Sequence, residues 1–200
     1  MKRWLILACL LGAFAGAFFV APSAQAVPYA SAAEMTDAEF LQPHRSDITG
    51  EMVHNVWRWY GIPPHILLSI IGAETSLGDP VLGGRLISEG HHNYGCMRVA
   101  GTTSKWGMLS TGSVVVAGKE WYSFPSMELG LMALGRYLKV GPTANPGYYL
   151  RSFRADHNWY EAFAVIYYGR GVPGFWAYVQ HLRALDAKFC RMAGEYGWLW

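Results

Sequence analysis

One glutamate of this 200-residue chain stands in a run that is otherwise almost free of charge. Glu74 falls in the last turn of the helix predicted over PPHILLSIIGAETSLGD, in which residues 66–71 are nearly all apolar. Burial and the negative end of the helix dipole both disfavour the carboxylate, so both raise its pKa. A carboxyl group that stays protonated near neutral pH can donate a proton to the departing oxygen of a glycosidic bond. The alternative is a surface glutamate at a fraying helix end, and these residues alone leave both interpretations open.

The sequence gives little support to other kinds of catalytic centre. His91 and His92 are adjacent, but no second ligand pair at metal spacing and no His-Glu-x-x-His motif accompanies them. No Gly-x-Ser-x-Gly motif marks a serine hydrolase, and seven histidines are too many to single out one base. We therefore expect neither a metal ion nor an organic cofactor.

Helical patterns surround Glu74 on both sides. Thr49 is a plausible N-cap for a helix that Gly61 ends. Pro63-Pro64 then opens the helix of Glu74, and Gly78 is expected to close it. Later helices are predicted after Ser126 over MELGLMALGRYLKV, and at about 148–154, 158–168 and 174–193.

Residues 79–123 have a different character, because glycine is frequent and the helical period is absent. The best strands are Ser113–Ala117 and Trp121–Phe124, with Gly118 and Lys119 between them, which predicts a short hairpin. The sequence therefore predicts a mainly α fold, in which a helical body carries a small β-hairpin lobe.

The N-terminal residues predict export. Lys2 and Arg3 precede the uncharged apolar run Leu5–Val20, and Ala24-Gln25-Ala26 supplies a small-x-small cleavage pattern. We predict a signal peptide over 1–26, an N-terminal arm that is extended or forms a loose first turn over 27–47, and a catalytic domain over 48–200. The alternative is an uncleaved anchor, and only then would the protein contact a membrane. The rest of the chain is expected to be secreted, or to lie in the periplasm or cell wall.

The charge balance argues against nucleic-acid binding. The predicted signal peptide holds two of the sixteen basic residues and none of the fourteen acidic ones, so the remaining chain has a formal net charge of zero. A nucleic-acid binder would usually show a basic excess or stripe. Aromatic residues make up 15% of the chain, enough to build a core and to leave some aromatic faces for sugar rings.

Two of the three cysteines, Cys96 and Cys190, lie beyond the predicted signal peptide. An even pair in an oxidising compartment is consistent with a disulfide. We expect the two to be joined, although two free buried thiols fit the sequence as well.

The segments that follow Glu74 resemble the catalytic signature of the lysozyme-like superfamily. AETSLG followed about twenty residues later by HHNYGCMR resembles the endo-β-N-acetylglucosaminidase branch, where a helix-ending glutamate precedes an Asn-x-aromatic-Gly turn. It is also similar to the lytic transglycosylases, in which a Glu-Ser pair precedes a Gly-Leu-Met-Gln stretch. WYSFPS resembles the glucosaminidase strand and turn, and LMALGRYL resembles a transglycosylase helix. The likeness spans roughly residues 48–190. It implies a lysozyme-like α+β fold, with a glycan groove between the helical body and the small β-hairpin lobe.

Several further residues are candidates for the site, one of them through the same resemblance. NWYEAFAVIYYGRG is similar to the segment that holds the transglycosylases' active-site tyrosine, which would place that role on Tyr167. Tyr94 is expected to pack beside Glu74 and to line the groove, and a plain core aromatic is the alternative. Asn93 would hold a sugar amide or simply the turn. The aromatic residues expected as sugar platforms in the lobe are Trp106, Trp121 and Phe124.

The chain departs from both branches in informative ways. Arg98 stands where the transglycosylase pattern has glutamine. No acidic residue lies where glucosaminidases carry a second glutamate, since Glu120 and Glu89 are elsewhere. The departures favour a mechanism with one protein acid, completed by the substrate's own N-acetyl oxygen or C6 hydroxyl.

The sequence therefore predicts a monomeric enzyme that acts on peptidoglycan glycan strands. The expected reaction is glucosaminidase-like cleavage of β-1,4 bonds, and a lytic transglycosylase that yields 1,6-anhydro ends is the alternative. A hypothesis of another class is a non-catalytic secreted module that binds glycan or serves a structural role, which the missing second carboxylate keeps open.

Overall fold

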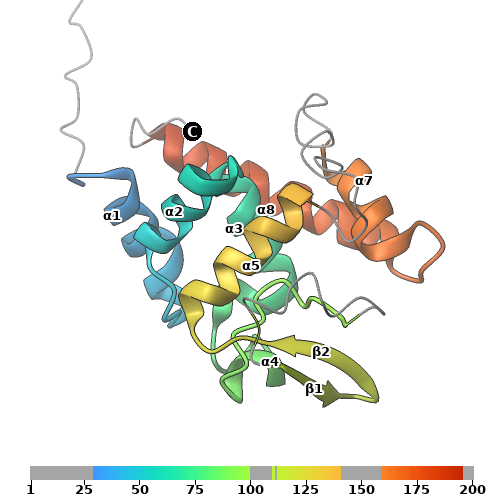
Figure 1. Cartoon of the computed structure of the whole chain (residues 1–200). Helices are drawn as coiled ribbons and strands as arrows, with labels where there is room; N and C mark the ends of the chain where they lie inside the picture. The colour runs from blue at the N-terminus through green and yellow to red at the C-terminus, as the bar shows by residue number, and fades with distance from the viewer. Residues whose placement is uncertain (1–28, 100–109, 111, 141–158, 196–200) are drawn as a thin grey trace, which may run out of the picture.

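The computed structural model of the chain describes residues 29–99, 110, 112–140 and 159–195. The predicted signal peptide and the helix expected at about 148–154 lie outside these residues. Within them, a helical body carries a small antiparallel hairpin (Figure 1), so the prediction of a mainly α fold with a small β lobe is confirmed. The elements in chain order are α1 (Ala32–Thr36), α2 (Gly50–Tyr60), α3 (Pro64–Thr75), α4 (Arg85–Ser88), β1 (Gly112–Val116), β2 (Lys119–Ser123), α5 (Met127–Val140), α7 (Trp159–Ala164) and α8 (Phe175–Glu195).

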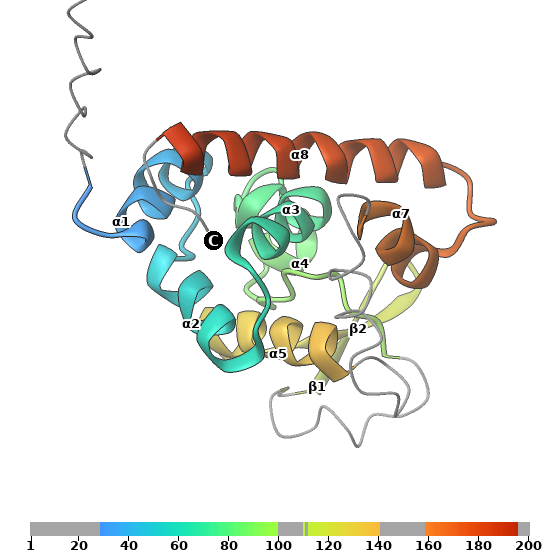
Figure 2. The ribbon, with the colours of Figure 1, turned by 90° about the horizontal axis from the view of Figure 1, so that it is seen from above.

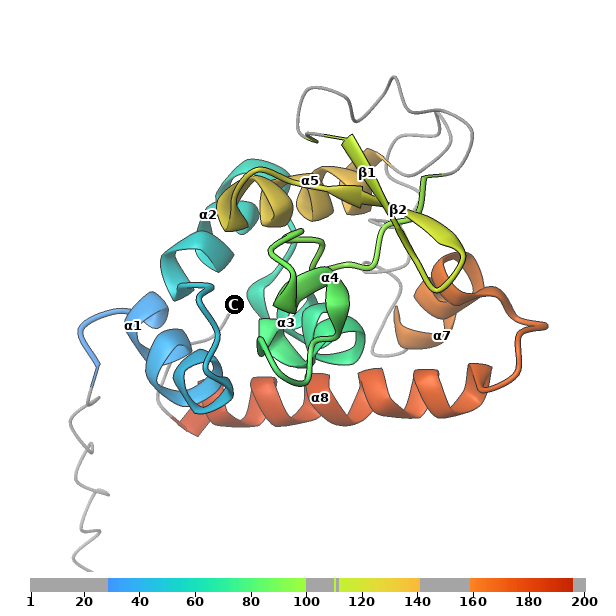
Figure 3. The same cartoon turned by 90° about the horizontal axis from the view of Figure 1, so that it is seen from below.

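Helix α3 lies at the centre of the helical body. The long helix α8 runs along one side of it, and α2 and α5 lie on the other (Figures 2 and 3). Because α3 is apolar on most faces, it is stable only when it is enclosed, and Leu67, Leu68, Ile70 and Ile71 are all fully buried. No helix in the described ranges is long and apolar enough to cross a membrane. The polar side chains of α3 reach neighbours or solvent mainly near its two ends.

The signals that start the first helices act as the sequence predicts. The Thr49 hydroxyl accepts a hydrogen bond from the Met52 amide at 3.3 Å, Gly61 ends α2 with a φ of 71°, and proline occupies the first turn of α3. The end of α3 differs from the prediction. The helix ends at Thr75, and a short 3₁₀ turn spans Ser76–Gly78, within which Ser76 and Leu77 adopt the left-handed conformation.

The segment expected to be an extended or loosely turned arm is helical in its described part. After α1, a π-type turn spans Asp37–Leu41 and a 3₁₀ turn spans Gln42–His44. Met35 and Phe40 from this segment are fully buried in the core. The alternation of small and polar residues in the sequence conceals these two apolar anchors, which hold the segment against α2 and α8.

The hairpin lies beside α4 and beneath α5 in the view of Figure 1. Its two strands pair in register from Gly112 opposite Ser123 to Val116 opposite Lys119, so they begin and end slightly earlier than predicted. Arg98 forms a further antiparallel bridge with Trp121. The segment around Arg98 thus pairs with β2 on the edge that β1 leaves open.

The last helices follow the predicted order. The Ser126 hydroxyl caps α5 by accepting the Leu129 amide at 3.2 Å. Helix α7 ends at Ala164, and a π-type turn spans Val165–Gly169. Helix α8 then extends as far as Glu195.

A buried carboxylate joins α3, α7 and α8. One oxygen of Asp186 lies 2.6 Å from His65 Nδ1, and its other oxygen accepts hydrogen bonds from Tyr160 at 3.0 Å and Trp159 at 3.3 Å. Burial raises the pKa of Asp186, but these donors outweigh burial and leave the pKa below its ordinary value. Asp186 therefore fixes the position of α8 along α3.

Replacing Asp186 with alanine removes the acceptor that His65, Tyr160 and Trp159 share. We expect the free energy of unfolding at neutral pH to fall by about 2–4 kcal/mol. The exposed Arg183 on the same helix supplies the control, since Arg183→Ala should change it by less than about 0.5 kcal/mol. The pKa of Asp186 is lower in the folded protein than in the unfolded chain. Asp186 therefore contributes to the free energy of unfolding above its ordinary pKa, and this contribution disappears as the pH falls through its pKa in the folded protein. Urea unfolding measures both effects, and equally small losses in the two variants would contradict the assignment.

Candidate active site

Glu74 lies in the last turn of α3, where the sequence predicted it. Its side chain is half-buried, and withdrawal from water raises its pKa from 4.5 to about 7, although hydrogen bonds from Tyr178 and Cys96 act in the opposite direction. Burial is thus the larger effect, because few polar groups replace the lost water. Near neutral pH the carboxyl group is divided between its protonated and ionised forms, so a large fraction of the molecules can donate a proton.

Tyr178 on α8 is the direct partner of this carboxyl group. Its hydroxyl donates a hydrogen bond to Glu74 Oε1 at 2.6 Å. Burial, the charge of Glu74 and this hydrogen bond raise the pKa of Tyr178 far above its ordinary value, so the phenol stays protonated. The Tyr178 ring stacks on Tyr168 with centroids 4.7 Å apart. Tyr178 therefore holds one carboxyl oxygen of Glu74 in a fixed direction.

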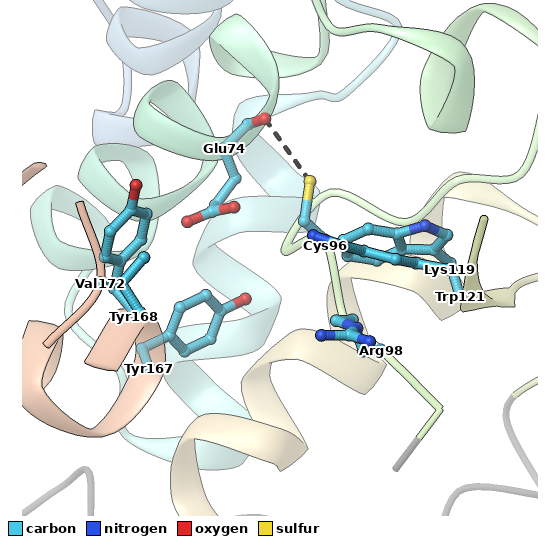
Figure 4. A pocket seen from close by; sticks show the side chains of 8 residues that line it. All are labelled: Glu74, Cys96, Arg98, Lys119, Trp121, Tyr167, Tyr168 and Val172. Atoms are coloured by element: carbon cyan, nitrogen blue, oxygen red, sulfur yellow. Dashed lines mark hydrogen bonds between the residues drawn. The ribbon is translucent and has the colours of Figure 1, made fainter. Parts of the chain in front are cut away.

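Glu74 lines an open cleft with a volume of about 350 Å³ (Figure 4). A cavity of this size falls within the range of small-ligand sites. The lining combines aromatic rings, two cations and a single carboxyl group. Its residues are Glu74, Cys96, Arg98, Lys119, Trp121, Tyr167, Tyr168 and Val172.

The turn that follows the predicted HHNYG motif is attached to the end of α3. The Thr75 hydroxyl lies 3.1 Å from Ile71 O and 3.3 Å from Tyr94 O, so it links the end of the helix to the turn. Asn93 is fully buried, and its side chain bonds both the amide and the carbonyl of Met97. The same side-chain amide reaches the Tyr122 carbonyl at 2.9 Å. Asn93 therefore holds the turn and ties it to β2, and it does not line the cleft.

The hairpin supplies one side of the cleft. Lys119 and Trp121 are two residues apart on β2, so their side chains share a face of the strand. Arg98 lies directly opposite Trp121, and its guanidinium is 5.8 Å from the centre of the indole ring. The pairing of the 97–99 segment with β2 thus places two cations and one aromatic face toward the cleft.

The π-type turn after α7 supplies the opposite side. Successive residues of a regular α-helix point about 100° apart, whereas the wider turn lets Tyr167 and Tyr168 both line the cleft. The Tyr167 hydroxyl donates a hydrogen bond to the Gly95 carbonyl, and its ring stacks on Phe163. Burial and the charge of Glu74 raise the pKa of Tyr167 well above its ordinary value, which keeps it neutral. Figure 4 shows the Glu74 carboxyl group directed toward Tyr167.

Two predicted groove residues lie in the core instead. Only 2% of Tyr94 is exposed, its ring packs close to Gly78, and its hydroxyl is 3.5 Å from His92 Nδ1. Phe124 is also 2% exposed and packs against Tyr122. The expectation that Tyr94 and Phe124 contact a sugar is therefore corrected. Trp106 lies outside the described residues.

The predicted disulfide is absent, because Cys96 and Cys190 are both free thiols. Cys96 Sγ lies 3.6 Å from the Glu74 carbonyl, at the end of α3, and Cys190 Sγ lies 3.9 Å from Asp186. Asp186 contacts His65, which is nine residues before Glu74 and hence about 13 Å away along the helix axis. A disulfide needs Cα atoms within about 7 Å, so the two cysteines lie at opposite ends of α3.

One group of potential metal ligands lies away from the cleft. His65, Asp186 and Cys190 offer atoms within 4.8 Å of one another. Both oxygens of Asp186 already accept hydrogen bonds from protein donors, so this group is a closed junction between helices. The adjacent histidines His91 and His92 contact different groups. His91 Nδ1 lies 3.1 Å from the Ser123 hydroxyl, and His92 lies beside Tyr94.

Sequence reasoning missed Tyr178 and Lys119 as residues of this site. Tyr178 comes 104 residues after its partner and belongs to no recognisable motif, so only the packing of α8 on α3 reveals the pair. Lys119 stood between the predicted strands as a turn residue. Side chains alternate along a strand, so a predicted strand that began at Lys119 would have placed Lys119 on the same face as Trp121.

No protein-family model matches the chain, and no curated protein matches it significantly. Among solved structures, the chain is similar to the catalytic domain of the autolysin Auto from Listeria monocytogenes, at 15% sequence identity. The match covers 73% of this chain and 81% of that domain, with a TM-score of 0.48.

The hydrogen bond between Tyr178 and Glu74 predicts a pH-dependent loss of stability in Tyr178→Phe. This bond lowers the pKa of Glu74, so it stabilises the ionised form more than the neutral form. We expect the variant to lose about 1 kcal/mol at pH 5, and about 1 kcal/mol more at pH 9, where Glu74 is charged.

Tyr168→Phe is the matched control, because the Tyr168 hydroxyl bonds Pro173 O and not Glu74. Its effect on stability should not change between the two pH values. Urea unfolding curves at pH 5 and pH 9 measure the difference. A loss in Tyr178→Phe that is equal at both pH values would show that the phenol does not act on the charge of Glu74.

Proposed function

We propose that this protein cleaves β-1,4 glycosidic bonds in the glycan strands of peptidoglycan, with Glu74 as the general acid. The observation that carries the proposal is a single carboxyl group with a pKa of about 7 at the edge of an open, aromatic-lined cleft. Aromatic faces suit sugar rings, and the carboxyl group supplies the proton that a departing sugar oxygen requires.

In the proposed reaction, Glu74 gives its proton to the bridging oxygen while the bond from that oxygen to C1 breaks. Positive charge then develops at C1 and the ring oxygen. The hydrogen bond from Tyr178 orients the carboxyl group for this transfer. Tyr167 lies across the cleft from Glu74, and its neutral phenol oxygen is suited to stabilise the positive charge at C1. Trp121 offers a ring face to a neighbouring sugar.

The group that completes the displacement is proposed to come from the substrate. Glu74 is the only carboxylic acid among the described residues that line the cleft. Attack by the N-acetyl carbonyl oxygen at C1 would form a cyclic intermediate within the sugar. The sugar would then not be bonded covalently to the protein. Water then opens this intermediate and returns a proton to Glu74, so one water molecule is consumed in each cleavage. This sequence gives the hydrolytic, glucosaminidase-like outcome.

The same observation supports a second candidate, the lytic transglycosylase reaction. There the C6 hydroxyl of the cleaved sugar attacks C1 and its proton passes to Glu74, so that a 1,6-anhydro end forms and no water is consumed. Both reactions use Glu74 first as acid and then as base. They differ only in which oxygen attacks C1.

The proposed family is the glucosaminidase branch of the lysozyme-like superfamily. Support comes from the helix-ending Glu74, the Asn93-Tyr94-Gly95 turn attached to that helix end, and the hairpin that follows. Peptidoglycan lies outside the cytoplasmic membrane, so the proposed activity agrees with the export signal predicted for residues 1–26 and with a secreted, periplasmic or cell-wall location.

Glu74→Gln should abolish the activity, because glutamine accepts the Tyr178 hydrogen bond but cannot donate a catalytic proton. We expect clearing of a peptidoglycan suspension to slow by at least about 100-fold. Glu89→Gln, which alters an exposed glutamate paired with Arg85, should retain full activity. For the unaltered protein, activity should fall about tenfold per pH unit above pH 7, since ionised Glu74 has lost its proton.

Mass spectrometry of the products separates the two reactions. Reducing N-acetylhexosamine ends indicate hydrolysis, and 1,6-anhydro ends indicate transglycosylation. If the unaltered protein and Glu74→Gln both bind peptidoglycan and neither cleaves it, the enzyme proposal is wrong and the protein is a glycan-binding module.

A further inference from the structure

The cleft holds two cations that the proposed cleavage step does not use. Arg98 and Lys119 are both exposed, and both line the cleft together with Glu74. No carboxylate in the described part of the chain forms an ion pair with either side chain. Among the described residues, the Arg98 guanidinium contacts the Trp121 ring and forms no hydrogen bond, so none of them occupies the donors that a ligand could use.

The nearest acidic residue along the strand points away from these cations. Glu120 lies between Lys119 and Trp121, and side chains alternate between the two faces of a strand. The Glu120 carboxylate bonds the Ser113 hydroxyl, across the hairpin on the other face. The face that carries Arg98, Lys119 and Trp121 is therefore positive and aromatic.

The carboxyl group of Glu74 does not neutralise the positive charge of Arg98 and Lys119 when Glu74 is able to donate a proton. As a general acid Glu74 must be protonated, and then the described lining of the cleft carries two positive charges and no negative one. A cleft lined by one sign of charge concentrates ligands of the opposite sign. With a neutral glycan bound, neither cation would have a charged partner among the described residues.

We propose that Arg98 and Lys119 bind a carboxylate carried by the glycan close to the scissile bond, and so select acidic glycan strands over neutral β-1,4-linked N-acetylglucosamine polymers. The geometry supports one combined subsite, in which Trp121 contacts a sugar face and the flanking cations contact its acidic substituent. This inference rests on the proposed function for the identity of the substrate. In peptidoglycan the carboxylate belongs to the peptide where one is attached through the lactyl group, and to the free lactyl group where the muramic acid carries no peptide.

Binding to matched substrates tests the proposal independently of cleavage. The substrates are intact peptidoglycan, the same material with its carboxylates capped as methylamides, and strands freed of peptide so that only lactyl carboxylates remain. The Glu74→Gln variant binds without turnover, so its affinity for each is measured by cosedimentation. We expect capping to weaken binding about tenfold, and 0.5 M salt to remove most of the difference.

Adding Arg98→Gln and Lys119→Gln to this variant should abolish the preference for uncapped material. Arg191→Gln is the control, because Arg191 is exposed on α8 about 20 Å beyond Tyr178 and lies outside the cleft. Circular dichroism and melting temperature establish that each variant is folded. In the protein that keeps Glu74, the ratio of kcat/KM for uncapped over capped material should fall in the same double variant, mainly through KM.

The outcomes separate this inference from the proposed function. Cleavage that depends on Glu74 but is equal on capped and uncapped material, together with equal binding, overturns the carboxylate subsite alone. A binding preference that disappears in the double variant, without cleavage of any substrate, supports the subsite and contradicts the enzymatic proposal. If lactyl-only strands, in which the lactyl group is a free carboxylate, bind at least as tightly as intact peptidoglycan, in which it is an amide, a free lactyl carboxylate satisfies the subsite. Weaker binding of the lactyl-only strands assigns the recognised carboxylate to the peptide.

Discussion

A carboxyl group withdrawn from water at the end of an apolar helix is the constraint on which the site depends. Burial raises the pKa of Glu74 to about 7, and Tyr178 supplies the hydrogen bond to its carboxyl group. A second strong donor would return the pKa toward its ordinary value, and a fully sealed environment would exclude a substrate. Glu74 combines a raised pKa with access because its helix ends where the cleft begins.

The surrounding elements keep that environment in place from both sides. Helix α8 brings Tyr178 to Glu74, and Asp186 fixes the position of α8 on α3 two turns further along. On the other side, Thr75 and Asn93 attach the 93–97 turn to the helix end and to β2. The cleft is therefore bounded by parts of the chain that are far apart in sequence and joined by a few buried polar contacts.

The sequence predicted what depends on local pattern. Thr49, Gly61, Pro64 and Ser126 act through neighbours a few residues away, so these helix boundaries could be foreseen, as could the position of Glu74. The partners of Glu74 could not, because Tyr178 meets it only through the packing of α8 on α3. Tyr94 and Phe124 were misplaced for a related reason, since the type of an aromatic residue does not reveal which face of a turn or strand is buried.

The ionisation of Glu74 in the folded protein is the most direct test of this account. Carbon-13 NMR of glutamate side-chain carboxyl groups, with the Glu74 signal identified by its absence in Glu74→Gln, would follow the titration of this one group. The account predicts a midpoint near pH 7, well above those of the exposed glutamates. A midpoint near 4.5 would contradict it, because Glu74 would then be ionised at neutral pH and unable to serve as the proton donor.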